Sequence, residues 1–246
     1  MKILPIASSS DGNCVLLSSP NTDIIIDAGA ILKSVKQHTG KLDAIFISHE
    51  HSDHWEHVGP LKRFYKCPVY MNEYSYNERR GRIDITEKDY IKVNPGDEVQ
   101  VGNFTITHFS TKHDTKMSFG YLVKEENGPT LCYITDTGMI TPLMLNYMLK
   151  SSVLFIEADY DEQLLTVYTG YEQWLKDRIK SNFGHLSNQQ VLEFLKEHNI
   201  FDTVIFGHLS PRTNTPETIN TLVKEAFPDT NTKFYTAPLT EAIECL

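Results

Sequence analysis

The stretch SHEHSDHW, residues 48–55, places three imidazoles and a carboxylate within six positions. These four side chains are His49, His51, Asp53 and His54. The apolar run DAIFIS precedes them and an amphipathic pattern follows, so we expect a loop between a strand and a helix. Neutral imidazole and carboxylate suit zinc, manganese or iron, and so short a loop can direct two donors at each of two adjacent ions. The stretch therefore predicts a metal site.

The rest of the chain is typical of an α/β protein with a mixed sheet. Apolar runs predict strands at KILPI, CVLLSS, DIIIDAG, DAIFIS, FTITHF, FGYLVKE, TLCYIT, VLFIEA and TVIFG. Amphipathic patterns predict helices over residues 55–65, 141–149, 171–179, 187–198 and 216–227, and Ser187 with Gln190 predicts a capping box on the fourth. From Tyr90 to Thr135, turn residues at 95–97, 102–103 and 127–128 join consecutive strands, so we expect antiparallel pairs there.

Length and composition favour a single globular domain over residues 1–246, with 40% apolar and 22% charged residues. The N-terminus becomes polar too soon for a signal peptide, and no apolar run reaches membrane-spanning length, so we expect a cytoplasmic protein without a membrane partner. The cysteines occur singly, which favours reduced thiols over a zinc knuckle. They are Cys14, Cys67, Cys132 and Cys245.

The formal net charge of −9 disfavours a protein that grips long nucleic acid by its overall field, because such binding depends on Lys and Arg. Two local basic clusters are candidates for substrate contact, although such runs are usually solvated faces. One contains Arg79, Arg80 and Arg82 near Tyr74 and Tyr76, and the other contains Lys176, Arg178 and Lys180. Bound divalent cations would offset part of the negative charge where an anionic substrate must lie.

Polar residues suited to chemistry follow several of the predicted strands. They are His49 after DAIFIS, Asp136 after TLCYIT, Glu157 after VLFI and His208 after TVIFG. Because open α/β sheets place their sites at such strand ends, we expect these side chains to lie close together.

The HxHxDH pattern after an apolar strand is the signature of the metallo-β-lactamase superfamily, which this chain resembles. The similarity continues through ASSSDGNC (7–14), DIIIDAG (23–29), KCPVYMNE (66–73), TDTG (135–138), IEADYD (156–161), GHLSN (184–188) and GHLSPRTN (207–214). These segments occur in the order seen in YycJ-type proteins, a branch similar to ribonuclease Z-like phosphodiesterases and associated with exonuclease activity on DNA. The resemblance covers nearly the whole chain and implies a four-layer αββα sandwich with mixed sheets.

The resemblance also implies two divalent ions, zinc or manganese, and their ligands. One ion would be held by His49, His51 and a histidine after FTITHF, the other by Asp53, His54 and His208, with Asp136 bridging the two. Both His108 and His113 are available as the third histidine of the first ion. We choose His113 because it lies in a turn and its His-Asp pair matches the family's, whereas His108 lies within the strand.

Two adjacent ions can lower the pKa of a shared water and stabilise both the attacking and leaving oxygens of a phosphodiester. The resemblance assigns His185 as the general acid for the leaving alkoxide, with Glu157 orienting it. Asp53 is expected to take part in catalysis as well as in metal binding.

Contacts with the substrate are predicted at two loops. The Ser- and Gly-rich opening can present Ser10 and Asn13 to a phosphate, although an ordinary hairpin turn explains it equally well. Arg212 and Asn214, just after His208, are further candidates, and a surface loop is the alternative there.

We therefore predict a phosphodiesterase in which a metal-bridging hydroxide attacks phosphorus, acting as an exonuclease on DNA in preference to RNA. A small or cyclic nucleotide substrate fits the acidic charge at least as well. Acyl or thioester hydrolysis and a non-catalytic metal-binding module are the alternatives. A diiron redox role is disfavoured because His51 stands where those relatives carry glutamate. The oligomeric state, monomer or homodimer, stays open.

Overall fold

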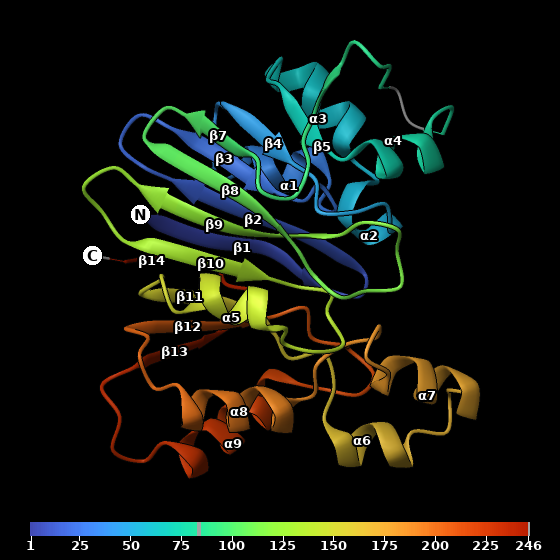
Figure 1. Cartoon of the computed structure of the whole chain (residues 1–246), viewed down its shortest axis with the longest axis vertical. Coiled ribbons are helices and arrows are strands. Elements are labelled where there is room, and N and C mark those ends of the chain that lie inside the picture. The colour runs from blue at the N-terminus through green and yellow to red at the C-terminus, as the bar shows by residue number, and fades with distance from the viewer. Residues whose placement is uncertain (83–84, 246) are drawn as a thin grey trace.

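The computed structural model describes residues 1–82 and 85–245, whose strands form two sheets packed face to face (Figure 1). Strands of the first sheet are β1 (Lys2–Ser9), β2 (Gly12–Ser18), β3 (Asp23–Ile26), β4 (Ala44–Phe46), β5 (Val69–Met71), β6 (Tyr90–Lys92) and β14 (Ile243–Glu244). Strands of the second are β7 (Glu98–Val101), β8 (Phe104–Ser110), β9 (Phe119–Glu125), β10 (Thr130–Ile134), β11 (Val153–Glu157), β12 (Thr203–Gly207) and β13 (Lys233–Thr236). Their orders are β14-β1-β2-β3-β4-β5-β6 and β13-β12-β11-β10-β9-β8-β7.

Both sheets are mixed, as predicted. In the first, β14, β1, β2 and β3 pair antiparallel, whereas β3 to β6 pair parallel. In the second, β7 to β10 pair antiparallel and β10 to β13 parallel. The two sheets thus repeat one pattern, an antiparallel half followed by a parallel half.

Helices cover the outer face of each sheet and complete the four-layer αββα sandwich (Figure 1). On the first sheet lie α1 (Leu32–Lys36), α3 (Val58–Tyr65) and α4 (Glu73–Arg79). On the second lie α5 (Pro142–Met148), α8 (Asn188–Glu197) and α9 (Pro216–Ala226). The short α2 (Ser52–Trp55), α6 (Glu162–Val167) and α7 (Gln173–Lys180) lie toward one end of the sandwich. None of the helices formed by the described residues has the length and apolar character needed to span a bilayer.

The uninterrupted apolar runs are explained by burial on both sides of each sheet. In β3, Ile24 and Ile26 contribute to the core between the sheets, while Ile25 faces the helices of the first sheet. In β10, Tyr133 points into the central core and Cys132 faces the helices of the second sheet. Because side chains alternate along a strand, a strand buried on both faces must be apolar at every position.

The predicted turns are correct at two of three places. Residues 102–103 join the antiparallel neighbours β7 and β8, and Asn127, with φ of 57°, lies between the antiparallel β9 and β10. The turn at 95–97 does not join paired strands, because β6 belongs to the first sheet and β7 to the second. There the chain crosses between sheets, so the expected pairing of consecutive strands is wrong at this turn and correct from β7 to β10.

The helix predicted over residues 55–65 is interrupted. The chain leaves α2 after Trp55 and begins α3 at Val58, because the backbone N–H of His57 donates to Ala28 O at 2.9 Å instead of continuing the helix. The capping box on α8 is confirmed: Gln190 N donates to Ser187 Oγ at 3.1 Å, and Ser187 N donates to Gln190 Oε1 at 2.8 Å.

Gly29, just beyond β3, is where three segments of the site meet. Its N–H donates to Asn13 O at 2.7 Å, and the N–H of Ala28 donates to His54 O at 2.6 Å. A Cβ on Gly29 would lie 1.9 Å from Asp53 O and 2.4 Å from Asn13 N. Both obstacles are backbone atoms, so the β1–β2 hairpin and the SHEHSDHW loop can approach this closely only at a glycine.

We expect Gly29→Ala to lower the free energy of unfolding by about 1–3 kcal/mol or more, because the added methyl must separate backbone segments. The matched control is Gly40→Ala, where a Cβ meets nothing within 4 Å, and a change within about 0.5 kcal/mol is expected. Equilibrium unfolding in urea measures both. Equal unfolding midpoints for the two variants would contradict the close approach.

Candidate metal centre

The polar side chains that follow the predicted strands gather at one edge of the sandwich, together with residues of α2. His49 follows β4, Asp136 follows β10, and His208 follows β12. The β1–β2 hairpin joins the same edge through a bridge between Ser9 and Leu209. Loops from both sheets therefore contribute to one site.

His49, His51 and His113 form a first group, whose nitrogens lie within 4.8 Å of one another. His113 Nε2 is 3.2 Å from His51 Nδ1, while His113 Nδ1 donates to the carbonyl of Gly184 at 3.1 Å. Since a carbonyl can only accept, Nδ1 carries the proton and the lone pair of Nε2 points into the site. Burial, as the largest influence, lowers the pKa of His113 to about 4 and that of His49 well below its usual value, so both rings are neutral.

Asp53, His54 and His208 form a second group within the same distance limit of 4.8 Å. His54 Nε2 is 3.1 Å from Asp53 Oδ2, and His208 Nε2 is 3.6 Å from the same oxygen. On its other side, His54 Nδ1 is 2.7 Å from Asp27 Oδ2. Although burial opposes ionisation of Asp53, the neighbouring His54 and His208 hold the pKa of that carboxyl far below its usual range.

Asp136 lies between the two groups. Its Oδ1 is 3.6 Å from His113 Nε2 and 3.3 Å from His208 Nε2, and its Oδ2 is 3.1 Å from His54 Nε2. Both Asp136 and His208 have left-handed backbone conformations, with φ of 55° and 52°. Such conformations are uncommon outside glycine, although Asp and His adopt them more readily than most residues, and they cluster at functional sites.

The donors fit a divalent metal ion. His49 Nε2 and His208 Nε2 are buried without a hydrogen-bond partner among the described residues. A buried polar atom left unpaired costs about 1–3 kcal/mol, and a cation in the site would supply both nitrogens with a partner. Several imidazoles around few carboxylates also match the preference of zinc and related ions rather than calcium or magnesium.

His185 and Glu157 stand next to this cluster. His185 Nδ1 is 3.1 Å from Glu157 Oε2, and the His185 ring stacks on the ring of His208 with centroids 5.1 Å apart. Burial opposes protonation of His185, but Asp159 and Glu157 outweigh it and raise the pKa of His185 to about 9. The ring therefore holds a proton, and its 18% exposed side chain can offer that proton to a ligand.

Three carboxylates that support the site were not among the predicted site residues, although Asp114 completes the His-Asp pair by which His113 was chosen. Asp27 orients His54, and Asp159 Oδ1 lies 3.5 Å from His208 Nδ1. Asp114 Oδ1 lies 3.3 Å from His113 Nε2. Asp27 and Asp159 both come just after buried strands, which is the signal that drew attention to Asp136. Applied to every acidic residue, it would have found these two.

The predicted substrate contacts occupy different environments. Asn13 is fully buried among the donors, with Nδ2 3.0 Å from Asp53 Oδ2 and 3.1 Å from His54 Nε2. Ser10 is exposed at the tip of the β1–β2 hairpin, which is an ordinary two-residue turn. Arg212 is exposed on the facing loop, 3.9 Å from Asp11 Oδ1.

Asn214 does not reach this surface. It is 3% exposed and donates to Ala158 O at 2.7 Å and to Asn188 Oδ1 at 2.8 Å. Its amide is used to join the loop after β12 to the start of α8, so the contact with phosphate predicted from the sequence is wrong for this residue.

The two basic clusters also differ. Arg79 donates through Nε to Glu50 O at 2.8 Å and covers the ring of Trp55, so it braces the SHEHSDHW loop from outside. Arg178 donates through Nε to Asp114 Oδ2 at 2.6 Å. The second cluster therefore touches the edge of the metal centre through Arg178.

A model of the beta-lactamase superfamily domain matches residues 22–208, which include most of the donors described above. The chain belongs to the metallo-β-lactamase superfamily. It is 31% identical over 228 residues to exodeoxyribonuclease WalJ of Streptococcus pneumoniae, covering 86% of this chain and 82% of that protein. It is 28% identical over 225 residues to exodeoxyribonuclease YycJ of Bacillus anthracis, covering 86% and 83%.

A solved structure agrees with this superfamily's fold along the whole chain. The metallo-beta-lactamase fold protein YhfI from Bacillus subtilis superposes with a TM-score of 0.77 over 99% of both chains, at 19% identity. The metallo-β-lactamase fold expected from the HxHxDH pattern is therefore confirmed, and its histidine and aspartate clusters indicate divalent metal.

His113→Ala is expected to weaken metal binding. Loss of a residue that only orients a metal ligand lowers metal affinity by about 10- to 100-fold, and loss of the ligand itself should cost at least as much. His108 is the matched histidine: it is fully buried beside Phe46, and its Nδ1 donates to Asp97 O at 3.0 Å. His108→Gln should lower stability but leave metal content unchanged. Metal content after dialysis, measured by elemental mass spectrometry, decides between them. Loss of metal from the His108 variant alone would make His108, and not His113, the third histidine ligand.

Proposed function

We propose that this chain is a metal-dependent phosphodiesterase that removes nucleotides from DNA ends. The observation that carries the proposal is the His185–Glu157 pair beside Asp136, with His185 Nδ1 3.9 Å from Asp136 Oδ1. Phosphodiester hydrolysis needs a proton for the leaving alkoxide, whereas acyl hydrolysis on metals does not require a separate acid. The similarity to two exodeoxyribonucleases over more than four fifths of the chain supports DNA as the substrate.

The site is proposed to hold two divalent ions, zinc or manganese. The first would be held by His49, His51 and His113, the second by Asp53, His54 and His208, with Asp136 between them. When bound, such a pair supplies an activated water and positive charge for the developing negative charge on phosphate oxygens. This chain's own residues must then position the diester and handle the leaving group.

His185 is proposed to donate the proton to the leaving oxygen. Its Nδ1 side is occupied by Glu157, which leaves Nε2 free to hold a proton toward a substrate. Glu157 cannot swing away, because its Oε1 accepts from Thr137 N at 2.9 Å and from Leu186 N at 3.1 Å. The backbone therefore fixes the carboxylate, and the carboxylate fixes the ring.

Ser10 and Arg212 are proposed to contact the phosphate strand from two facing loops, the β1–β2 hairpin and the loop after β12. The ion pair of Arg212 with Asp11 is long, at 3.9 Å, and both side chains are exposed. An incoming phosphate can therefore take Arg212 from Asp11 at little cost, because exposed ion pairs contribute less than about 1 kcal/mol. Asn13 is proposed to hold Asp53 and His54 in place rather than to bind substrate.

A small nucleotide is the second candidate substrate, favoured by the net charge of −9. A long duplex presents many phosphates to this acidic surface, whereas a short or cyclic diester presents one or two. Cleavage of cyclic or short dinucleotides without cleavage of DNA would select it.

We expect His185→Ala to slow cleavage of end-labelled DNA by about 10²- to 10⁴-fold, the usual contribution of a general acid. Hydrolysis of bis(p-nitrophenyl) phosphate should fall much less, because p-nitrophenolate leaves without a proton. Both rates are measured on zinc- or manganese-loaded protein, with His51→Ala as the variant that should lose both activities.

The exposed His38, beyond α1, provides the control, and His38→Ala should retain both rates. Equal losses on the two substrates in His185→Ala would reject proton donation. If metal-loaded wild type hydrolysed thioesters but no phosphodiester, acyl hydrolysis would replace this proposal. If it hydrolysed neither, a non-catalytic metal-binding module would replace it.

A further inference from the structure

The helix α7 buries none of its residues, although it lies only five residues before His185. In Figure 1, α6 and α7 project at the lower right, beyond α8 and α9. Trp174 on α7 is 67% exposed, whereas Trp55 is 4% exposed. A single exposed aromatic ring needs no ligand to explain it, so the groups around Trp174 decide whether this surface can bind one.

One face of α7 is tied to the metal centre. Arg178 donates to Asp114 Oδ2 at 2.6 Å, and Asp114 Oδ1 lies 3.3 Å from His113 Nε2. The guanidinium is therefore separated from the proposed ligand His113 by a single carboxylate. Trp174 precedes Arg178 by four residues, so both side chains lie on the same face of the helix, one turn apart.

The loop after α7 is held firmly against the same centre. A Cβ on Gly138 would lie 2.2 Å from Ser181 O, so the loop packs on the backbone just beyond Asp136. Within this loop Phe183 is 48% exposed, and Lys112 Nζ lies 4.6 Å from the centroid of its ring. A second exposed aromatic ring with a cation thus lies at the rim of the site.

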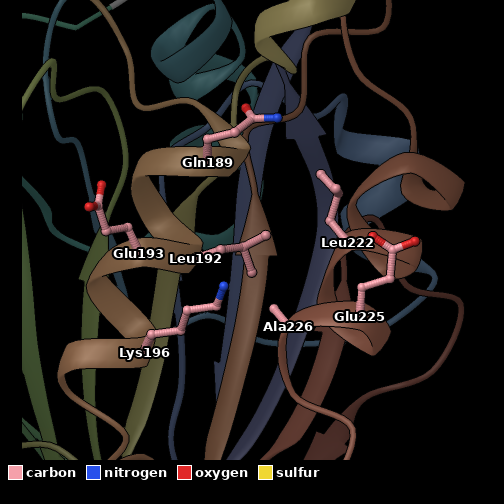
Figure 2. A pocket seen from close by; sticks show the side chains of 7 residues that line it. All are labelled: Gln189, Leu192, Glu193, Lys196, Leu222, Glu225 and Ala226. Carbon is pink, nitrogen blue, oxygen red and sulfur yellow. The ribbon is translucent and has the colours of Figure 1, made fainter.

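A groove between α8 and α9, of about 490 Å³, offers different chemistry. In Figure 2, Leu192 and Leu222 point toward each other across it, Lys196 extends from α8 toward it, and Glu193 lies on the outer side of α8. Two carboxylates, Glu193 and Glu225, against the single lysine make this lining unfavourable for a phosphate chain, and the lining residues include no aromatic ring. For a nucleic acid, the exposed rings and cations near the metal centre are the better surface.

We propose that Trp174, Arg178, Phe183 and Lys112, here called the α7 surface, bind an unpaired nucleotide that flanks the diester in the metal centre. Rings that stack on bases beside cations that contact phosphates are the usual means of binding single strands. In a duplex, neighbouring pairs cover both faces of every base except at the terminal pair, which exposes one. A base inside the strand can therefore stack on Trp174 only when it is unpaired. This inference rests on the proposed function and adds to it a preference for a single-stranded or frayed end.

The first test is binding, which does not depend on turnover. A short phosphorothioate oligothymidylate should quench the fluorescence of the metal-loaded protein, because the exposed Trp174 dominates the response while Trp55 is buried. Trp174→Phe should abolish the quenching yet retain binding measured by anisotropy of a labelled oligonucleotide, since phenylalanine still stacks. Quenching that persists in Trp174→Phe would overturn the proposal.

The second test is cleavage. Trp174→Ala should lower kcat/KM on single-stranded DNA by roughly 5- to 100-fold, the effect of losing one stacked base, and leave bis(p-nitrophenyl) phosphate hydrolysis within about twofold. Phe183→Ala should lower DNA cleavage in the same way. The matched control is Phe64→Ala on α3, because Phe64 is 45% exposed and also lies under a lysine, with Lys36 Nζ 4.3 Å from its centroid.

An abasic nucleotide placed in turn at each position near the DNA end locates the stacked base. At that position the abasic nucleotide should lower the activity of wild type as much as Trp174→Ala lowers activity on intact DNA. The abasic nucleotide and Trp174→Ala combined should lower activity no more than either one alone. Additive losses at every position, or a Phe64→Ala effect equal to that of Trp174→Ala, would overturn the α7 surface. If wild type binds oligonucleotide through Trp174 but cleaves none, the proposed function fails and the surface stands.

Discussion

The carboxylate of Asp136 lies between two groups of histidines, and the geometry around it determines the rest of the site. Its oxygens are 3.1–3.6 Å from nitrogens of His54, His113 and His208. These three rings come from segments that follow strands of both sheets, His54 from α2, so the sandwich must bring its two halves together at this edge. The left-handed backbone of Asp136 turns the side chain inward immediately after β10. That conformation costs free energy, which the surrounding hydrogen bonds must offset.

Glu157 supplies much of that support. It is fully buried at the end of β11, and its two oxygens accept the backbone N–H groups of Asp136, Thr137 and Leu186 at 2.9–3.1 Å. A buried carboxylate is tolerated only when its oxygens are bonded in this way. The same side chain also orients His185. Glu157 thus fixes both the Asp136 turn and the proposed proton donor His185, which holds the proton donor at a fixed position relative to the metal centre.

The repeated sheet pattern explains why the site forms at one edge. In each sheet the parallel strands end in loops that carry polar side chains, and Gly29 lets the loops of the first sheet approach within van der Waals distance. The chain as a whole has a formal net charge of −9. Near the centre, however, α7 and the loop after it leave aromatic and cationic side chains exposed. The chain is therefore net negative, whereas the edge of the site carries the cations Lys112 and Arg178.

The sequence by itself determined the fold class, the mixed sheets and the local group His49, His51, Asp53 and His54, because strand periodicity and close spacing are local properties of the chain. Strand-end reasoning also identified Asp136, Glu157 and His208, since carboxyl ends of parallel strands share an edge. Spacing left His108 and His113 as alternatives, and it missed the sheet crossing at residues 95–97. Only the tertiary structure pairs the amide of Asn214 with that of Asn188 and places Arg178 beside Asp114. It also leaves Trp174 exposed to solvent. Those outcomes depend on which distant backbone and side chains fill the space around each residue, and that space does not exist until the two sheets have packed together.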